Sequence, residues 1–175
     1  LARFKNIQDR ELVVGWAGNS KWAGDIEDFK GFHSILKPAV EELQMEGLNI
    51  RLELADRQNG FIPHAEMVNY YARIDLYVCP SKIEGTPNPV LESMACGVPV
   101  ISTDVGVVSD AFGPLQKEWL LAERSQKALK EKLRKFYFER ESLTRNLSKE
   151  NLETIKKWDW SIKSQNFKLF FDSVL

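Results

Sequence analysis

The chain has 175 residues and a formal net charge of -1, with 43% hydrophobic and 28% charged residues. This balance is typical of one globular domain, and the near-zero charge gives no reason to expect nucleic acid as a partner. No apolar run approaches the roughly 18 residues of a membrane span, and the segment 1–10 is interpreted as the end of a linker.

Short apolar runs alternate with segments of helical periodicity along the chain, which favours a fold of alternating strands and helices. The apolar runs predict strands at 12–18, 49–55, 74–79 and 98–102, and a short fifth strand at 119–122. The periodic segments predict helices at 28–46, 64–73 and 89–96, a helical region in two pieces at 125–157, and an amphipathic helix at 161–174 that closes the segment 158–175. Pro38 complicates the first helix, since proline lacks the N–H that a helix interior uses.

The predicted strands are short and apolar throughout, as in a parallel sheet that helices cover on both faces. We therefore predict an α/β fold, a doubly wound parallel sheet, with 1–175 forming one domain. In such sheets ligands bind at the carboxyl ends of the strands, where the strand order changes direction. The loops 18–28 and 80–88 both follow a carboxyl end, so we expect them at the same edge of the sheet.

The segment 84–102 (EGTPNPVLESMACGVPVIS) carries two glutamates at the start of a predicted helix. The N-terminal end of a helix attracts anions such as phosphate, and Glu84 and Glu92 can accept hydrogen bonds from hydroxyl groups. A diphosphate flanked by two sugars fits this arrangement. Equally, Glu92 could be stabilised by the helix dipole alone, by about 0.3–1 kcal/mol, and Glu84 could be a solvated loop residue.

The run 81–101 resembles the signature of glycosyltransferase family 4, in which a serine and a Glu-Gly pair precede P-V-L-E-A-M-A-C-G-x-P-V-I. The core of that signature is two glutamates separated by seven residues, which Glu84 and Glu92 match. Further segments also resemble this family, so the resemblance covers nearly the whole chain: 75–81, 103–106, Lys30-Gly31, and Trp158-Asp159-Trp160 with the final helix.

Members of this family have two facing Rossmann-like domains, the GT-B arrangement, and this chain resembles the C-terminal, nucleotide-sugar-binding half. The resemblance implies that Glu84 contacts the hydroxyls of the donor sugar and that Glu92 binds the ribose hydroxyls of the nucleotide. It also implies that Lys30 neutralises phosphate charge, so Glu84 and Lys30 are the expected catalytic residues. The other donor-binding residues that it implies are Gly18, Asn19, Lys21, Ile62 beside the base, Gly85, Thr86, Pro87 and Asn88.

Two segments depart from the family's pattern. Many members have a Gly-Arg pair after the first strand, whose arginine meets the diphosphate, whereas this chain reads Gly18-Asn19-Ser20-Lys21. Lys21 either supplies that charge, without the fork of an arginine, or is a solvated loop residue. Thr86-Pro87-Asn88 stands where relatives often have Phe-Gly and an apolar residue, so the identity of the sugar does not transfer.

The resemblance implies transfer of a sugar from a nucleoside-diphosphate sugar, with retention at the anomeric carbon, in bacterial cell-surface polysaccharide synthesis. We expect no cofactor or metal, because no His, Cys and Asp residues have the spacing of metal ligands. The acceptor site would lie in an N-terminal domain missing from this chain, so we expect the chain alone to transfer nothing. A GT-B-fold epimerase and a non-catalytic nucleotide-binding module stay open as alternatives.

The compartment and the remaining partners rest on weaker patterns. Two cysteines in apolar runs, interpreted as reduced, fit a cytoplasmic protein, and the start of the sequence holds no apolar run of signal-peptide length. The basic segment 127–140 (KALKEKLRKFYFER) either contacts the inner face of a membrane peripherally or forms a solvated helix face. Cys79 and Cys96 are interpreted as reduced core residues, and His33 and His64 as surface or helix-start residues.

Overall fold

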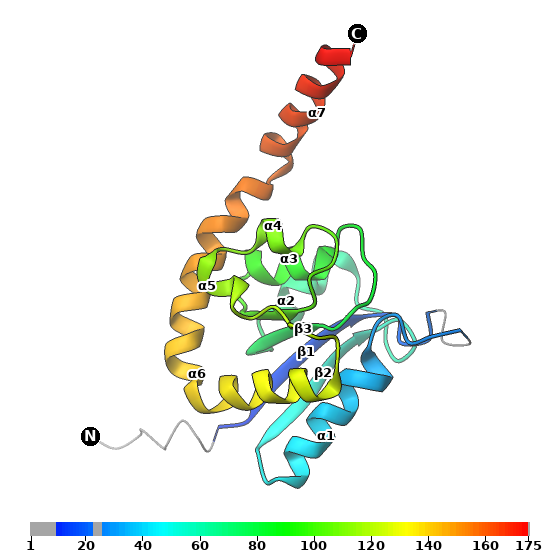
Figure 1. The fold of residues 1–175 in the computed structure, drawn as a ribbon, viewed down its shortest axis with the longest axis vertical. Helices are drawn as coiled ribbons and strands as arrows, with labels where there is room; N and C mark the ends of the chain where they lie inside the picture. The colour runs from blue at the N-terminus through cyan, green and yellow to red at the C-terminus, as the bar shows by residue number, and fades with distance from the viewer. Residues whose placement is uncertain (1–9, 23–25, 175) are drawn as a thin grey trace.

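The computed structural model describes residues 10–22 and 26–174, so nearly all of the segment interpreted as a linker lies outside the described residues. A four-stranded sheet in the order β2-β1-β3-β4 forms its centre, and every pair of neighbouring strands is parallel (Figure 1). The strands are β1 (Leu12–Gly18), β2 (Ile50–Asp56), β3 (Leu76–Cys79) and β4 (Val100–Ser102). These confirm the four predicted strands, whereas the predicted fifth, 119–122, is only a bridge between Ser102 and Leu120.

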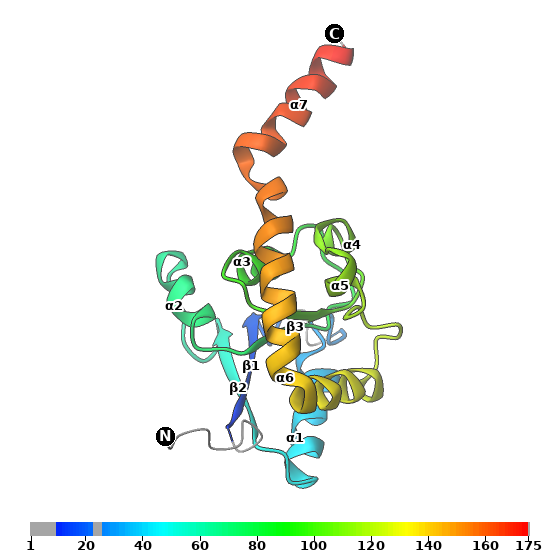
Figure 2. The same ribbon diagram turned by 90° about the vertical axis from the view of Figure 1, so that its left-hand side faces the viewer.

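Helices connect the strands and lie on both sides of the sheet (Figures 1 and 2). The longer ones are α1 (Lys37–Met45), α3 (Asn88–Ala95), α6 (Gln126–Thr154) and α7 (Trp160–Val174). The shorter ones are η2 (Phe32–Leu36), η3 (His64–Glu66), α2 (Met67–Tyr71), α4 (Val108–Ala111), α5 (Pro114–Lys117) and η4 (Ile155–Trp158). The sequence patterns do not predict α4 and α5, which are single turns.

Each face of the sheet has its own hydrophobic core, because alternate side chains of a strand point to opposite faces. On one face, Leu12, Val14 and Trp16 of β1 pack with α1 and the first part of α6. On the other face, Val13 of β1 and Tyr77 of β3 pack with α2, α3 and α4. The predicted doubly wound α/β fold is therefore confirmed.

The strand order changes direction between β1 and β3. From β1 the chain passes to β2 on one side, and it later passes from β3 to β4 on the other side. The carboxyl ends of β1 and β3 therefore open at the same edge, as predicted for the two loops that follow them. The guanidinium group of Arg124 joins these loops, since it donates hydrogen bonds to the carbonyl oxygens of both Asp28 and Pro80.

Two predicted helical regions differ from the observed ones. The region predicted at 28–46 becomes helical only at Phe32, because Gly31 before it has a φ of 66°. Pro38 is the second residue of α1, which follows the π-helical turn η2 directly, so the helical pattern changes just before the proline. The region predicted in two pieces over 125–157 contains the single helix α6, which changes direction midway (Figure 1).

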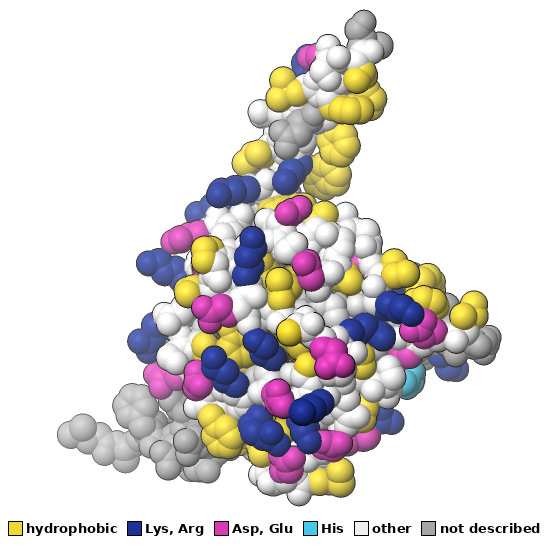
Figure 3. All heavy atoms as spheres, viewed as in Figure 1, with side chains coloured by type: hydrophobic (Ala, Val, Ile, Leu, Met, Phe, Trp, Pro, Cys, Tyr) yellow, Lys and Arg dark blue, Asp and Glu magenta, His cyan; other side chains and the backbone are white. Residues whose placement is uncertain are grey.

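The basic segment 127–140 lies within α6, and its apolar side is part of the core. Leu129 and Leu133 are fully buried, while Lys130 forms an ion pair with Glu42 of α1. Figure 3 shows basic and acidic side chains interspersed over this surface. Apart from the exposed Phe138, the large apolar side chains of this segment are buried, which favours a solvated helix face.

α7 extends away from the sheet and from the helices that cover it (Figures 1 and 2). Its range confirms the closing helix predicted at 161–174. Large apolar side chains on it are exposed, among them Trp160, Phe167 and Phe171. Among the residues that the structure describes, no helix is both long and apolar enough to cross a membrane.

Candidate functional site

A partly buried ion pair joins the two loops at the edge where the strand order changes. The Nζ atom of Lys30 lies 2.6 Å from Oε1 of Glu84, and the two side chains are 23% and 17% exposed. The ammonium group also lies 5.5 Å from the centre of the Trp22 ring, close enough for attraction to the ring face. Lys30 and Glu84 are 54 positions apart in the sequence, so the fold creates the pair.

Backbone packing holds the loops that carry this ion pair. Gly31 has a φ of 66°, and a β-carbon at this position would lie 2.4 Å from the carbonyl oxygen of Pro80. Arg124 donates to the same carbonyl oxygen over 2.9 Å and to that of Asp28 over 2.5 Å. Only a glycine permits this approach, and the arginine fixes it.

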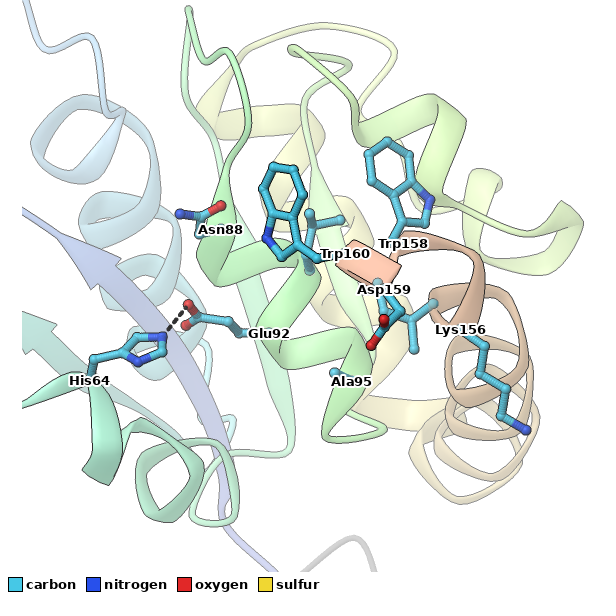
Figure 4. Close-up of a pocket in the computed structure, with 10 residues that line it drawn as sticks. His64, Asn88, Glu92, Ala95, Lys156, Trp158, Asp159 and Trp160 are labelled. Carbon is cyan, nitrogen blue, oxygen red and sulfur yellow. Dashed lines mark hydrogen bonds and ion pairs between the residues drawn. The ribbon is translucent and has the colours of Figure 1, made fainter. Parts of the chain in front are cut away.

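Three adjoining cavities follow this edge of the sheet. The first, of about 180 Å³, is lined among others by Gly18, Lys30, Glu84, Thr86, Pro87, Asn88 and Pro89. The second, of about 270 Å³, is lined among others by Gly18, Arg57, Phe61, Ile62, His64, Met67 and Pro89. The third, of about 490 Å³, is lined among others by His64, Asn88, Glu92, Trp158, Asp159 and Trp160 (Figure 4). Because neighbouring cavities share lining residues, they offer one continuous surface to an extended ligand.

Glu92 of α3 has a partner at each carboxylate oxygen. The hydroxyl of Tyr71 donates to Oε2 over 2.7 Å, and Nε2 of His64 lies 3.3 Å from Oε1. In Figure 4 the His64 ring and the Glu92 carboxylate point toward each other, whereas Lys156 points away from both. The carboxylate is thus held at the wall of the third cavity.

The loop between Glu84 and α3 leaves the first turn of that helix open. Pro87 stands at the N-cap position, and none of the described side chains caps this turn. Asn88, the first residue of α3, lines both the first and the third cavity. The positive end of the helix dipole therefore faces the region between Glu84 and Glu92.

A buried carboxylate, Asp56 at the end of β2, fixes the loop that follows β1. Its oxygens accept hydrogen bonds from the N–H of Ser20 over 3.0 Å and from the hydroxyl of Ser20 over 2.6 Å. Burial raises the pKa of Asp56, but hydrogen bonds from Ser20, Gln58 and Asn59 outweigh it and hold the pKa below its ordinary value of 3.8. The ionised carboxylate therefore ties the chain after Gly18 to β2.

The lowered pKa of Asp56 predicts a pH dependence of folding stability. A group whose pKa is lower in the folded chain stabilises the fold above its unfolded pKa, and this contribution is lost as pH falls through the folded pKa. We expect the free energy of unfolding to fall as pH drops below about 4, and to fall less steeply in Asp56→Asn. Urea unfolding at several pH values checks this, with the exposed Asp104→Asn as the control. Equal slopes in the wild type and Asp56→Asn would contradict it.

Most site residues expected from the sequence lie along this edge. Gly18, Lys30, Glu84, Thr86, Pro87 and Asn88 line the first cavity, Ile62 lines the second, and Glu92 lines the third. Three of the expected residues, Asn19, Lys21 and Gly85, are not among the described residues that line these cavities. Asn19 instead accepts hydrogen bonds from Gln58 and from the N–H of Lys21, whose side chain is exposed.

The sequence patterns do not identify Tyr71, His64 or Asp56 as site residues. His64 fits its interpretation as a surface and helix-start residue, because it begins η3 and its side chain is 88% exposed. Asp56 directly follows the predicted strand 49–55, at the edge of the sheet where ligands bind, and this position could have identified it. Tyr71 carries no comparable signal, since it reads as one apolar position of a helix.

The two cysteines differ in their surroundings. Both are free, and Cys79 is buried, which fits its interpretation as a core residue. Burial raises the pKa of the Cys79 thiol. The core position predicted for Cys96 is wrong, because this residue lies at the C-cap of α3 and is exposed. Within residues 10–22 and 26–174, no three His, Cys, Asp or Glu side chains could hold a metal ion together.

The chain is similar to known proteins over most of its length. The profile of the family described as Glycosyl transferases group 1 matches residues 29–153, well over half of the chain. The chain is 25% identical over 184 residues, covering 98% of its length, to the N,N'-diacetylbacillosaminyl-diphospho-undecaprenol alpha-1,3-N-acetylgalactosaminyltransferase of Campylobacter jejuni. It is 37% identical over 127 residues, covering 59% of its length, to the O-antigen chain mannosyltransferase B of Escherichia coli. The chain spans 48% of the first relative and 33% of the second.

A solved structure shows the same fold. Alr3699/HepE of Anabaena, determined in complex with UDP-glucose, matches 93% of this chain with a TM-score of 0.66 at 16% identity. The match covers 49% of that protein's chain. The fold is that of the C-terminal half of a GT-B architecture, as the sequence predicts.

Proposed function

This chain belongs to the glycosyl transferases group 1 family, and from that premise we propose that it is the donor-binding domain of a retaining glycosyltransferase. It binds a nucleoside-diphosphate sugar, and the sugar passes to an acceptor held by a separate N-terminal domain. The setting that we propose is cytoplasmic synthesis of a bacterial cell-surface polysaccharide. The names of the Campylobacter and Escherichia relatives, which describe transfer to an undecaprenol-linked sugar and to an O-antigen chain, support this setting.

The Lys30–Glu84 pair at the edge of the sheet is the observation that carries this proposal. A nucleoside-diphosphate sugar needs a cation for its diphosphate and hydrogen-bond acceptors for the hydroxyls of two sugars. Lys30 and Glu84 line the first cavity, and Glu92 lines the third cavity on the same edge. A cation and two carboxylates thus lie on one edge, which supports binding of a diphosphate flanked by two sugars.

In the proposed mechanism, the domain stabilises the negative charge that develops on the departing diphosphate. Lys30 and the open first turn of α3 act on this charge electrostatically. Glu84 holds the ammonium group in place over 2.6 Å, so little ordering is required when the diphosphate binds. The carboxylate of Glu84 also accepts hydrogen bonds from donor-sugar hydroxyls. This chemistry requires no metal and no cofactor.

The remaining donor contacts involve the loop after Glu84 and the second cavity. The backbone of Gly85, Thr86 and Pro87 lies against the sugar and the diphosphate. The second cavity, lined by Ile62 and Arg57, takes the base. Lys21→Ala tests whether Lys21 supplies a second positive charge for the diphosphate, since its affinity for a nucleoside diphosphate should then fall. Arg57→Ala is the comparison, because Arg57 is a cation that lines the second cavity.

Isothermal titration of the chain with UDP, GDP and ADP, and then with their sugar conjugates, tests the proposal. We expect one nucleotide to bind better than the others, and Glu92→Ala to weaken it by about tenfold or more, because hydrogen bonds to a charged group are lost. EDTA should leave the affinity unchanged, and the chain alone should transfer no sugar. Nucleotide affinity unchanged in Glu92→Ala would favour a non-catalytic module, and transfer by the chain alone would contradict the need for a second domain.

A further inference from the structure

Tyr71 contacts Glu92 from within the core. Tyr71 is 1% exposed, and its hydroxyl donates to Oε2 of Glu92 over 2.7 Å. Its ring packs edge-on against Tyr70, with 5.2 Å between the ring centres, and against Tyr77, with 6.2 Å between the centres. The two flanking rings leave the Tyr71 hydroxyl little freedom, so its hydrogen bond is directed at one oxygen of Glu92.

The direction of this hydrogen bond is fixed by chemistry. Burial, and secondly the hydrogen bond to Glu92, raise the pKa of Tyr71 well above its ordinary value, so the phenol stays neutral and donates its proton. The Glu92 carboxylate accepts this hydrogen bond at Oε2. A charge-assisted hydrogen bond of this kind is stronger than a neutral one and restricts the rotamer of the carboxylate.

The two oxygens of Glu92 consequently have different surroundings. Oε2 accepts from a buried donor, whereas among the described residues the partner of Oε1 is His64, at 3.3 Å, whose side chain is 88% exposed. An exposed partner at that distance is easily replaced by a ligand hydroxyl. Oε1 is thus the oxygen that a ligand hydroxyl can reach by displacing His64.

We propose that Tyr71 is a positioning residue, which holds Glu92 through Oε2 so that Oε1 is directed at the ribose hydroxyls of the bound nucleotide. This inference rests on the proposed function, in which Glu92 binds ribose. Tyr71 itself touches no ligand. Its effect should therefore appear only in the part of the binding energy that comes from the ribose hydroxyls.

The experiment compares UDP, GDP and ADP with their 2′,3′-dideoxy counterparts, which lack both ribose hydroxyls, by isothermal titration. We expect the wild-type chain to prefer the ribose form of its best nucleotide by about thirtyfold, and Tyr71→Phe to lower this preference to about threefold. Affinity for the dideoxy form should be the same in both proteins. A purely structural role of Tyr71 would weaken both forms equally and leave their ratio unchanged.

Tyr70→Phe is the control, because it removes the same group from the neighbouring buried residue. The Tyr70 hydroxyl donates to the carbonyl oxygen of Glu53 over 3.0 Å and not to Glu92, so its loss should leave the ribose preference at the wild-type value. A second check uses Glu92→Ala, in which adding Tyr71→Phe should cause no further loss of the preference. This check does not depend on how much stability Tyr71→Phe loses.

The outcomes separate this inference from the proposed function. If the wild type prefers the ribose form and Tyr71→Phe keeps that preference, Tyr71 does not position Glu92, while the proposed function stands. If the wild type binds nucleotides without any ribose preference, Glu92 does not bind ribose, and both are overturned. A preference lost in Tyr71→Phe and kept in Tyr70→Phe supports both.

Discussion

Replacing Lys30 with methionine is expected to weaken the binding of nucleoside diphosphates about a hundredfold. Two effects add in the same direction. The diphosphate loses a charge-assisted hydrogen bond, and the carboxylate of Glu84 loses its partner at 2.6 Å and then repels the ligand. Since both side chains are at most 23% exposed, solvent screens this repulsion less than at an open surface.

The Lys30→Met result can be separated from a general loss of charge. Lys82 is the control, because it pairs with Glu27 at 2.7 Å and lies 5.7 Å from the centre of the Phe29 ring. Lys82 does not belong to the described lining of the three cavities, so Lys82→Met should change nucleotide affinity by less than about threefold. Its greater exposure, 48%, makes this the milder substitution for stability as well.

A second variant tests the repulsion directly. Adding Glu84→Gln to Lys30→Met removes the unpaired charge, so the double variant should bind nucleoside diphosphates better than Lys30→Met does. Affinities from isothermal titration give this comparison, and the matched measurement with nucleoside monophosphates should show smaller differences. Equal affinities of Lys30→Met and the wild type would remove Lys30 from the donor site.

The strands could be predicted because their signal is local. The run 12–18 coincides with β1, and the other three predicted strands overlap the observed ones. Helix starts were less predictable. The apolar spacing places a helix start at 28, but Asp28 accepts hydrogen bonds from the N–H and hydroxyl of Ser34, and Gly31 turns the chain before the helix begins. Such a turn leaves no mark in apolar periodicity.

In the candidate site, too, some residues could be predicted from local sequence and others could not. Glu84 and Glu92 lie in one short segment whose sequence pattern identifies them. Lys30 was predicted from the resemblance of a second short segment, Lys30-Gly31. The partner of Glu92, Tyr71, lies 21 positions away, and Asp56 lies 36 positions from Ser20. These contacts depend on which strands are neighbours, and apolar periodicity does not determine the order β2-β1-β3-β4.

The loop that carries Glu84 packs closely against Gly106, a glycine of a different segment. Replacing this glycine is the second substitution for which we expect a large effect. Gly106 has a φ of 55°, and a β-carbon there would lie 1.9 Å from the carbonyl oxygen of Gly85 and 2.8 Å from that of Glu84. Gly106→Ala therefore requires the Glu84 loop to move by about 1 Å. We expect the free energy of unfolding to fall by about 3 kcal/mol.

Gly47→Ala isolates the part of this loss that comes from the backbone conformation. Gly47 also has a positive φ, 90°, but a β-carbon there would meet nothing within 4 Å. Gly47→Ala should therefore lower the free energy of unfolding by only about 1–2 kcal/mol, the cost of one non-glycine residue in a left-handed conformation. The excess in Gly106→Ala is then the cost of moving the loop. Because Glu84 is proposed to contact the donor sugar, Gly106→Ala should also weaken a nucleoside-diphosphate sugar more than the free nucleoside diphosphate, whereas Gly47→Ala should weaken neither. Equal stability and equal affinities in the two variants would show that the loop does not depend on Gly106.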